Sequence, residues 1–286
     1  MAKAWTRDGL RAMALLSPAY LWLTAAVFLP LSAMLFYSLL SDVPFGGAEW
    51  RITLDNYRAF FETGTYAALL WKSIRLGLTV TVVCILIGFP CAYVLAKTIR
   101  GRSREALFLL IILPFWSNSL VRIFSWAIVL RGNGVLELAV NAVLPFDIRL
   151  NLMFTQTAVV IGLVHSYLPY VILTTYLALQ AIDDTLIDAA RSMGAGKLTI
   201  LRRLILPLSL PGLLAGAVLV FVPVVGAFME PRILGGRFGT YYGTVIEDQF
   251  VAVFNWPLGA ALSFILLAVV LLILALSSPI LRRSRA

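Results

Sequence analysis

The sequence predicts an all-α integral membrane protein with six transmembrane helices, and two observations support this fold class. The 286-residue chain is 61% hydrophobic and only 13% charged, whereas a soluble domain is about 25% charged. Five stretches contain no Asp, Glu, Lys or Arg, and each exceeds the roughly 20 residues that a helix needs to cross the hydrocarbon core. Because unpaired backbone amides are costly in lipid, these stretches are expected to be helical: 12–41, 76–96, 150–182, 204–229 and 249–281.

The first span follows a basic start. Lys3, Arg7 and Arg11 precede it, as basic residues do in a signal peptide. The apolar run is longer than a signal sequence, however, and no small-residue cleavage site follows it. We therefore expect this segment to stay in the protein as a membrane anchor.

The connections and the sixth span come next along the chain. Residues 42–70 are expected to form an outer loop. The sixth span is expected over 106–130, although Arg122 interrupts it, and residues 131–151 are expected to form an outer segment with a short helix. Gly212 and Gly216 form a GxxxG pattern, which allows close approach of another helix.

Lys and Arg are unevenly divided between the segments that connect the spans. The N-terminus, residues 97–104, residues 183–203 and the C-terminal tail together carry fourteen of them, against seven in the opposite segments. Cytoplasmic loops carry the excess of Lys and Arg. Both termini are therefore expected to be cytoplasmic. The net charge of +9 then reflects contact with anionic lipid rather than with nucleic acid.

The sequence contains no pattern typical of a metal site, a cofactor site or a disulfide framework. Its two cysteines, Cys84 and Cys91, lie about 10 Å apart along one apolar helix, too far for a bridge. His165 is the single histidine, and we interpret it as a packing residue. Neither HExxH nor GxSxG occurs, so an intramembrane enzyme is disfavoured.

Residues 181–212 are more elaborate than a simple connector. Asp184 or Thr185 is expected to cap the start of a short helix, and Gly194 is placed for a left-handed helix end. A second short helix is expected to follow, before Pro207 ends it or begins the next span. Two amphipathic helices joined by a sharp turn would form a projection that fits a groove on a partner protein. The same pattern is compatible with a hairpin lying on the membrane surface.

This loop resembles the EAA loop of ABC importer permeases. The matching residues are Asp188-Ala189-Ala190, then Gly194, then Leu206-Pro207-Leu208 and Pro211-Gly212. Asp188 stands where the family has Glu, with the same charge on a shorter side chain. The resemblance implies the type I importer permease fold, in which residues 183–205 are a cytoplasmic coupling loop that docks on an ATPase subunit. It implies these coupling residues: Asp188, Ala189, Ala190, Arg191, Gly194 and Pro207.

Further segments are similar to the spermidine/putrescine-type permeases. They are LDNY (54–57), LPFWSNSLVRIFSWAIVLRGNGVL (113–136), FVPVVGAFMEPRILGG (221–236) and NWPLGAA (255–261). The resemblance implies import of polyamines across the bacterial inner membrane. It also implies the partners: two cytoplasmic ATP-binding subunits, a second homologous permease and an external substrate-binding protein. The chain has no GxxxxGK[ST] motif, so ATP is expected to be bound and hydrolysed by a partner.

The implied organisation has three parts. Residues 1–69 would hold the N-terminal tail, the first span and the outer loop, and residues 70–281 would form a permease core of five spans that contains the coupling loop. Another organic solute, amino-acid-like or a phosphonate, remains an alternative cargo. A channel or secondary transporter that works without an ATPase is also an alternative, but it would leave residues 183–205 without a purpose.

Polar residues at membrane depth are the candidates for contact with cargo, because they are costly there. A π face can bind an amine, and a carboxylate suits a polyamine. Serine and asparagine can instead form hydrogen bonds between helices, and an arginine near the outer face can extend its head group into water. The candidate pathway residues are Trp116, Asn118, Arg122, Tyr167 and Glu230. Glu230 is expected either to contact cargo or to pair with Arg232.

Overall fold

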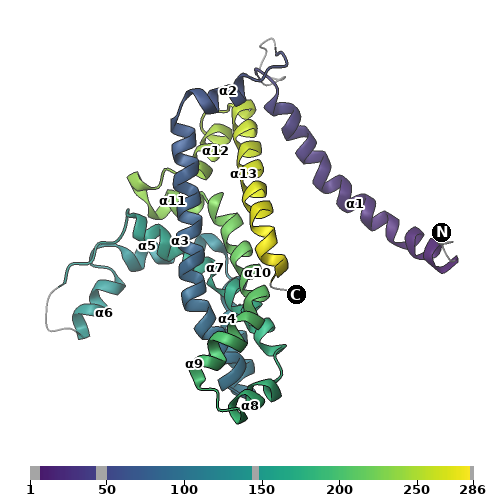
Figure 1. Cartoon of the computed structure of the whole chain (residues 1–286). Helices are drawn as coiled ribbons and strands as arrows, with labels where there is room; N and C mark the ends of the chain where they lie inside the picture. The colour runs from purple at the N-terminus through teal and green to yellow at the C-terminus, as the bar shows by residue number, and fades with distance from the viewer. Residues whose placement is uncertain (1–6, 43–49, 144–147, 284–286) are drawn as a thin grey trace. The chain divides into compact units, whose positions relative to one another are not determined.

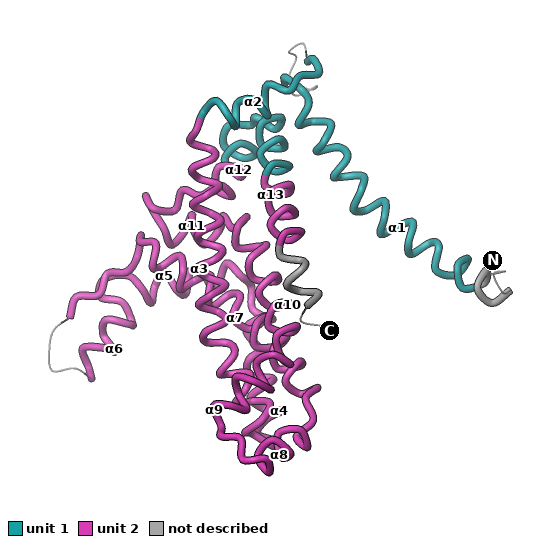
Figure 2. The backbone as a smooth tube through the Cα atoms, viewed as in Figure 1, with its two compact units in different colours: residues 1–63, 248–265 teal, residues 64–247, 266–286 magenta. Residues whose placement is uncertain are grey.

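A computed structural model describes residues 7–42, 50–143 and 148–283 of the chain (Figure 1). The described residues are almost entirely helical, and their one β-pairing is an isolated bridge between Leu40 and Ile52. The chain divides into two compact units, which Figure 2 colours separately. Residues 1–63 and 248–265 form unit 1, and residues 64–247 and 266–286 form unit 2. Lys3 and Arg285, which enter the charge argument, lie outside the described residues.

Five of the expected spans are confirmed as long apolar helices. Their membrane-length segments are Ala12–Ser38, Thr65–Thr98, Gln156–Gln180, Lys197–Val225 and Trp256–Leu276. They belong to α1 (Arg7–Ser38), α3 (Thr65–Tyr93) with its π-helical extension η1 (Val94–Thr98), α7 (Gln156–Gln180), α9 to α10 (Lys197–Val225) and α13 (Trp256–Arg283).

The sixth expected span, 106–130, is not one straight helix. It consists of α4 (Arg102–Ile112), the 3₁₀ turn η2 (Leu113–Trp116) and α5 (Ser119–Leu130), and the two halves meet at 98°. Pro114 lies in the turn, where its ring prevents the helix from continuing. Asn118 then begins α5 anew, because its side chain accepts the backbone N–H of Leu120.

Unit 2 is built around α3, α7 and α10, which run side by side in Figure 1. Its main core contains Val80 of α3, Leu163 of α7 and Val220 of α10, all fully buried. The glycines of these helices allow the close approach. A Cβ on Gly77 would lie 2.7 Å from a methyl carbon of Val225, and one on Gly88 would lie 2.9 Å from a methyl carbon of Val171.

The GxxxG pattern of α10 (Leu206–Val225) is used inside the chain. Gly212 faces Thr174 and Ala178 of α7, and a Cβ on Gly216 would lie 2.5 Å from the Thr174 hydroxyl oxygen and 3.0 Å from the Val171 Cα. Small residues let helix backbones approach closely in membranes. This face of α10 is therefore occupied by α7 of the same chain.

Unit 2 also contains short helices: α6 (Val135–Val143), α11 (Met229–Leu234), η4 (Gly236–Phe238) and α12 (Tyr242–Val251), the last of which ends in unit 1. α6 agrees with the short helix expected within 131–151. At the start of α3, the Lys72 ammonium donates to the carbonyls of Phe238 (3.1 Å) and Thr240 (2.8 Å). The beginning of α3 and the segment after α11 therefore lie at the same end of the unit.

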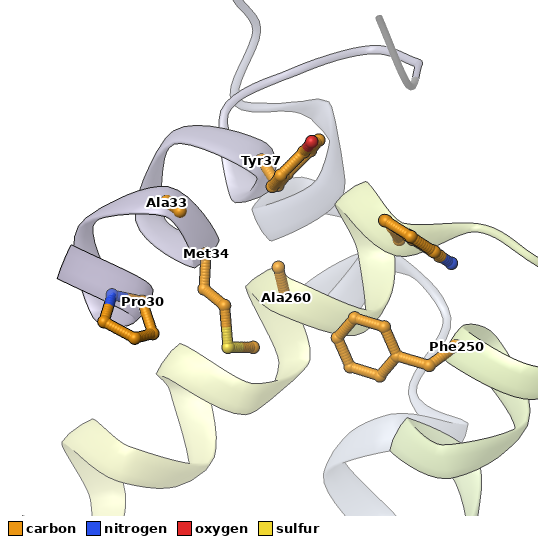
Figure 3. A pocket seen from close by; sticks show the side chains of 7 residues that line it. Pro30, Ala33, Met34, Tyr37, Phe250 and Ala260 are labelled. Carbon is orange, nitrogen blue, oxygen red and sulfur yellow. The ribbon is translucent and has the colours of Figure 1, made fainter. Parts of the chain in front are cut away.

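Unit 1 contains α1, α2 (Asp55–Glu62) and the first turns of α13. The Asn56 amide of α2 donates to the carbonyls of Ser38, the last residue of α1, and of Leu40, two residues further on. This unit contains an apolar cavity of about 360 Å³. It is lined by Pro30, Ala33, Met34, Tyr37, Phe250, Trp256 and Ala260 (Figure 3).

Candidate functional site

Residues 183–205, the expected coupling loop, form a projection of two short helices between α7 and α10, at one end of unit 2 (Figure 1). Its first helix is α8 (Asp184–Ser192), and its cap lies one residue before Asp184, the earlier of the two expected caps. Asp183 is the N-cap, and its carboxylate accepts the backbone N–H of Thr185 at 2.9 Å. This hydrogen bond is the main cause of the lowered pKa of Asp183.

The turn after α8 is a Schellman motif. The N–H of Gly194 donates to the Arg191 carbonyl at 2.9 Å, and the N–H of Ala195 donates to the Ala190 carbonyl at 3.0 Å. Gly194 has a φ of +82°, as expected for a left-handed helix end. The second helix, α9 (Lys197–Ile200), continues through the π-helical turn η3 (Leu201–Ile205) directly into α10.

The expected coupling residues divide into two groups. Asp188, Ala189 and Arg191 are exposed on α8, and Ala190 is half-buried. The Asp188 carboxylate pairs with Arg191 at 3.0 Å, and both side chains are in contact with solvent. Gly194 follows at the end of the same helix. Pro207, in contrast, lies in the first turn of α10, beyond η3, so it belongs to the connecting helix rather than to the projection.

Buried contacts attach the projection to the membrane helices. Ile187 of α8 lies in a core with Leu95 of the η1 turn, Leu179 of α7 and Ile205 of η3. A hydrogen bond from Lys97 is the main cause of the lowered pKa of Asp184. One face of α8 is therefore buried through Ile187, and the face with Asp188 and Ala189 is exposed.

Three of the five candidate pathway residues lie together. Arg122 of α5, Tyr167 of α7 and Glu230 of α11 lie on three helices that pack against one another, and a Cβ on Gly162 would lie 3.9 Å from the Glu230 Cγ. Ser166, one turn after Gly162 on α7, is within hydrogen-bonding reach of the Glu230 carboxyl group. Glu230 is 8% exposed. A Cβ on Gly162 would lie 2.5 Å from Leu234 of α11, so glycine at that position lets α11 pack against α7. The cluster formed by Arg122, Ser166, Tyr167 and Glu230 is called the polar cluster below.

The other two candidates, Trp116 and Asn118, lie at the break between α4 and α5. Trp116 is 87% exposed, and the Asn118 side chain caps α5. Arg122 does not simply extend into water, because its guanidinium donates to the Pro114 carbonyl at 2.8 Å. Glu230 had two expected roles, contact with cargo or a pair with Arg232, and in the structure Arg232 pairs with Glu247 of α12.

Sequence reasoning did not identify Ser166 and assigned His165 to packing. The His165 ring contacts Trp126 edge-on, with ring centroids 5.4 Å apart, and its buried Nδ1 has no hydrogen-bond partner among the described residues. The spacing of Gly162 and Ser166, one helical turn apart, was the available signal that small residues face α11. Within the described ranges, no group of three or more His, Cys, Asp or Glu residues could hold a metal ion.

The five long apolar helices and the bent sixth segment define a class of protein, a multi-span membrane protein. Residues 84–284 match the family described as binding-protein-dependent transport system inner membrane component, and the chain belongs to this family. It is therefore the permease of an ABC importer, a multi-pass inner-membrane transport subunit rather than an enzyme, and a separate subunit hydrolyses ATP.

The chain is also similar to individual permeases and to a solved transporter structure. The chain is 37% identical over 253 residues to the spermidine/putrescine transport system permease protein PotB of Escherichia coli K12, covering 88% of this chain and 91% of the relative. It is 34% identical over 265 residues to PotB of Haemophilus influenzae, covering 92% of both. A bacterial ABC transporter that imports the acidic polysaccharide alginate has the same fold, with a TM-score of 0.73 at 17% identity, covering 97% of this chain and 96% of that one.

Proposed function

We propose that this permease imports polyamines such as spermidine and putrescine. The observation that carries the proposal is the 34–37% identity, over most of the chain, to permeases named for these two cargoes. The buried carboxyl group of Glu230 supports it, because a carboxylate beside a transport path would attract a cationic amine.

The pathway is proposed to pass the polar cluster. Arg122 partly neutralises Glu230, and the hydroxyls of Ser166 and Tyr167 supply further hydrogen-bonding groups. Such a mixture could bind an ammonium group without holding it too tightly for release, as transport requires. Trp116 and Asn118 are proposed to border the path at the helix break, since discontinuous helices commonly form substrate sites in transporters.

Transport is proposed to be driven through α8. The exposed face with Asp188, Ala189 and Arg191 would dock on a cytoplasmic ATP-binding subunit, with Ala190, Gly194 and Pro207 shaping the projection and its connection to α10. Closure of two ATP-bound subunits would then carry α8 and tilt α3, α7 and α10 as a group. The core shared by Leu95, Leu179 and Ile187 supports movement as a group.

The orientation and partners follow from the same scheme. Residues 97–104 and 183–203 are proposed to face the cytoplasm together with both termini. The contact between Lys97 and Asp184 supports a common side for the two segments. A second permease chain would complete the pathway with the core of residues 70–281, and an external binding protein would deliver cargo to the opposite side.

The test is uptake of radiolabelled spermidine and putrescine by proteoliposomes that contain the complete complex with its ATPase, sister permease and binding protein. We expect ATP-dependent uptake, reduced by about tenfold or more in Glu230→Gln. Glu62→Gln, which changes an exposed acid, should behave like the wild type. Absence of uptake with the cognate binding protein present would refute the polyamine assignment. Equal uptake by both variants would remove Glu230 from the pathway.

A further inference from the structure

Lys97 is a basic residue held almost out of contact with solvent. It lies in the π-helical turn η1, which extends α3, and its side chain is only 9% exposed. Its neighbours Ala92 and Leu95 are buried in the core that also holds Ile187 of α8. Lysine is almost never fully buried unless its charge has partners, so the position of this side chain needs an explanation.

The Lys97 ammonium joins three elements. It donates to the Ile182 carbonyl at 2.6 Å and to Asp184 Oδ1 at 2.7 Å. Ile182 lies just beyond the end of α7, where the helix dipole favours a positive charge, and Asp184 is the first residue of α8. Lys97 therefore connects the end of α3 to the point where α7 passes into α8.

π-helical turns inside helices are uncommon and often occur at functional sites. In η1 the N–H of Ile99 donates to the Val94 carbonyl at 3.0 Å, which places one extra residue in the turn that carries Lys97. A second π-helical turn, η3, follows α9 on the other side of the projection. A π-helical turn therefore occurs at the end of α3, where Lys97 contacts α8, and another occurs between α9 and α10.

Arg100 provides an internal comparison. Its guanidinium lies 4.0 Å from the other oxygen of Asp184, but its side chain is 84% exposed. An exposed pair at that distance contributes little, because water and salt screen it. The two basic residues therefore approach the same carboxylate from very different environments.

We propose that Lys97 is a positioning residue that transmits displacement of α8 to α3 during transport. The inference rests on the proposed contact between α8 and the ATPase. α8 is covalently continuous with α7, and through α9 and η3 with α10, but it reaches α3 only through side-chain contacts. The charged hydrogen bonds of Lys97 are the polar part of that link, and they fix the end of α3 to the start of α8.

The test compares Lys97→Met, which keeps the length of the side chain but cannot donate, with Arg100→Met and Lys97→Arg. Hydrogen–deuterium exchange of the complete complex is measured with and without ATP. In the wild type, ATP should change exchange both in residues 184–192 and in residues 94–100. In Lys97→Met the change should persist in 184–192 and disappear in 94–100. Arg100→Met should match the wild type, and Lys97→Arg should restore most of the response.

The second measurement is the ratio of spermidine transported to ATP hydrolysed. We expect Lys97→Met to lower this ratio about fivefold or more while ATP hydrolysis continues. A proportional fall in transport and hydrolysis would indicate poor assembly only and would overturn the proposal, as would an unchanged response of residues 94–100. A wild-type complex without spermidine uptake would refute the polyamine assignment, and the exchange experiment would still decide the role of Lys97.

Discussion

The guanidinium of Arg122 donates a hydrogen bond of 2.8 Å to the carbonyl of Pro114, across the 98° break between α4 and α5. A proline turn frees backbone carbonyls that a continuous helix would pair. Arg122, the charge that interrupts the sixth predicted span, satisfies one of them. The same side chain interacts electrostatically with Glu230, so it links the helix break to the polar cluster.

We predict that Arg122→Met destabilises the break. The Pro114 carbonyl would lose its donor, and a hydrogen-bonding group left without a partner costs about 1–3 kcal/mol. The midpoint of thermal unfolding in detergent should fall, and Lys at this position should recover part of the loss. Ser125→Ala on the same helix is the control, because the Ser125 hydroxyl only bonds the Val121 carbonyl of its own helix. Equal midpoints for Arg122→Met and Ser125→Ala would refute this role.

Gly194 and Gly196 offer a matched pair in the coupling loop. A Cβ would meet nothing within 4 Å at either position, but only Gly194 has a positive φ, of +82°. Gly194→Ala should therefore cost roughly 1–2 kcal/mol of local stability through backbone strain alone. Gly196→Ala should be nearly neutral. Transport and binding-protein-stimulated ATP hydrolysis, measured side by side, should fall only in Gly194→Ala. Similar behaviour of the two variants would contradict the explanation.

Gly216 is predicted to be intolerant of even one added carbon. A Cβ at this position would lie 3.0 Å from the Val171 Cα. Because that Cα is a backbone atom, no side-chain rotation can relieve the contact. Overpacking of this kind costs about 1–3 kcal/mol. Gly226→Ala is the control, since the nearest atom there, a Leu266 methyl carbon, lies at 3.6 Å. The Tm of the purified permease should fall for Gly216→Ala and stay near the wild-type value for Gly226→Ala.

The attachment of α8 should respond to acid but not to mild changes near neutrality. Hydrogen bonds lower the pKa of Asp183, through Thr185, and of Asp184, through Lys97, below the ordinary value of 3.8. A depressed pKa means that the stabilisation is complete above 3.8 and is lost as the pH falls from there through the lowered values. Between pH 6 and 8 we expect no change.

A nitroxide attached at Ser192→Cys can report this titration, in a protein whose exposed Cys91 is replaced by serine and whose Cys84 is buried. Its mobility should stay constant from pH 8 to about 5 and rise below about 4. Replacing both Asp183 and Asp184 with asparagine should remove the acid-dependent rise. A rise that begins near pH 6 would point to a different titrating group.

The sequence predicted the helical spans because lipid imposes a simple rule on long apolar segments. The five charge-free stretches correspond to helices, and the positive φ of Gly194 agrees with its expected place at a helix end. The sixth stretch has the composition of a span, but composition does not show whether the helix axis changes direction within it. Pro114 and Asn118 each carry a local signal for a break, but the angle of 98° between the two halves is known only from the structure.

Composition, charge and local motifs in the sequence by itself determined the membrane class, the number of apolar segments, the two short helices between α7 and α10 and the family resemblance. The tertiary structure alone decided which polar side chains meet. It placed Glu230 near Arg122 and Ser166 rather than with Arg232, directed the GxxxG face of α10 onto α7, and brought Lys97 to Asp184. The members of each pair are far apart along the chain, or the sequence offers other residues of the same type as partners. Only the packing of the helices therefore sets the distances between them.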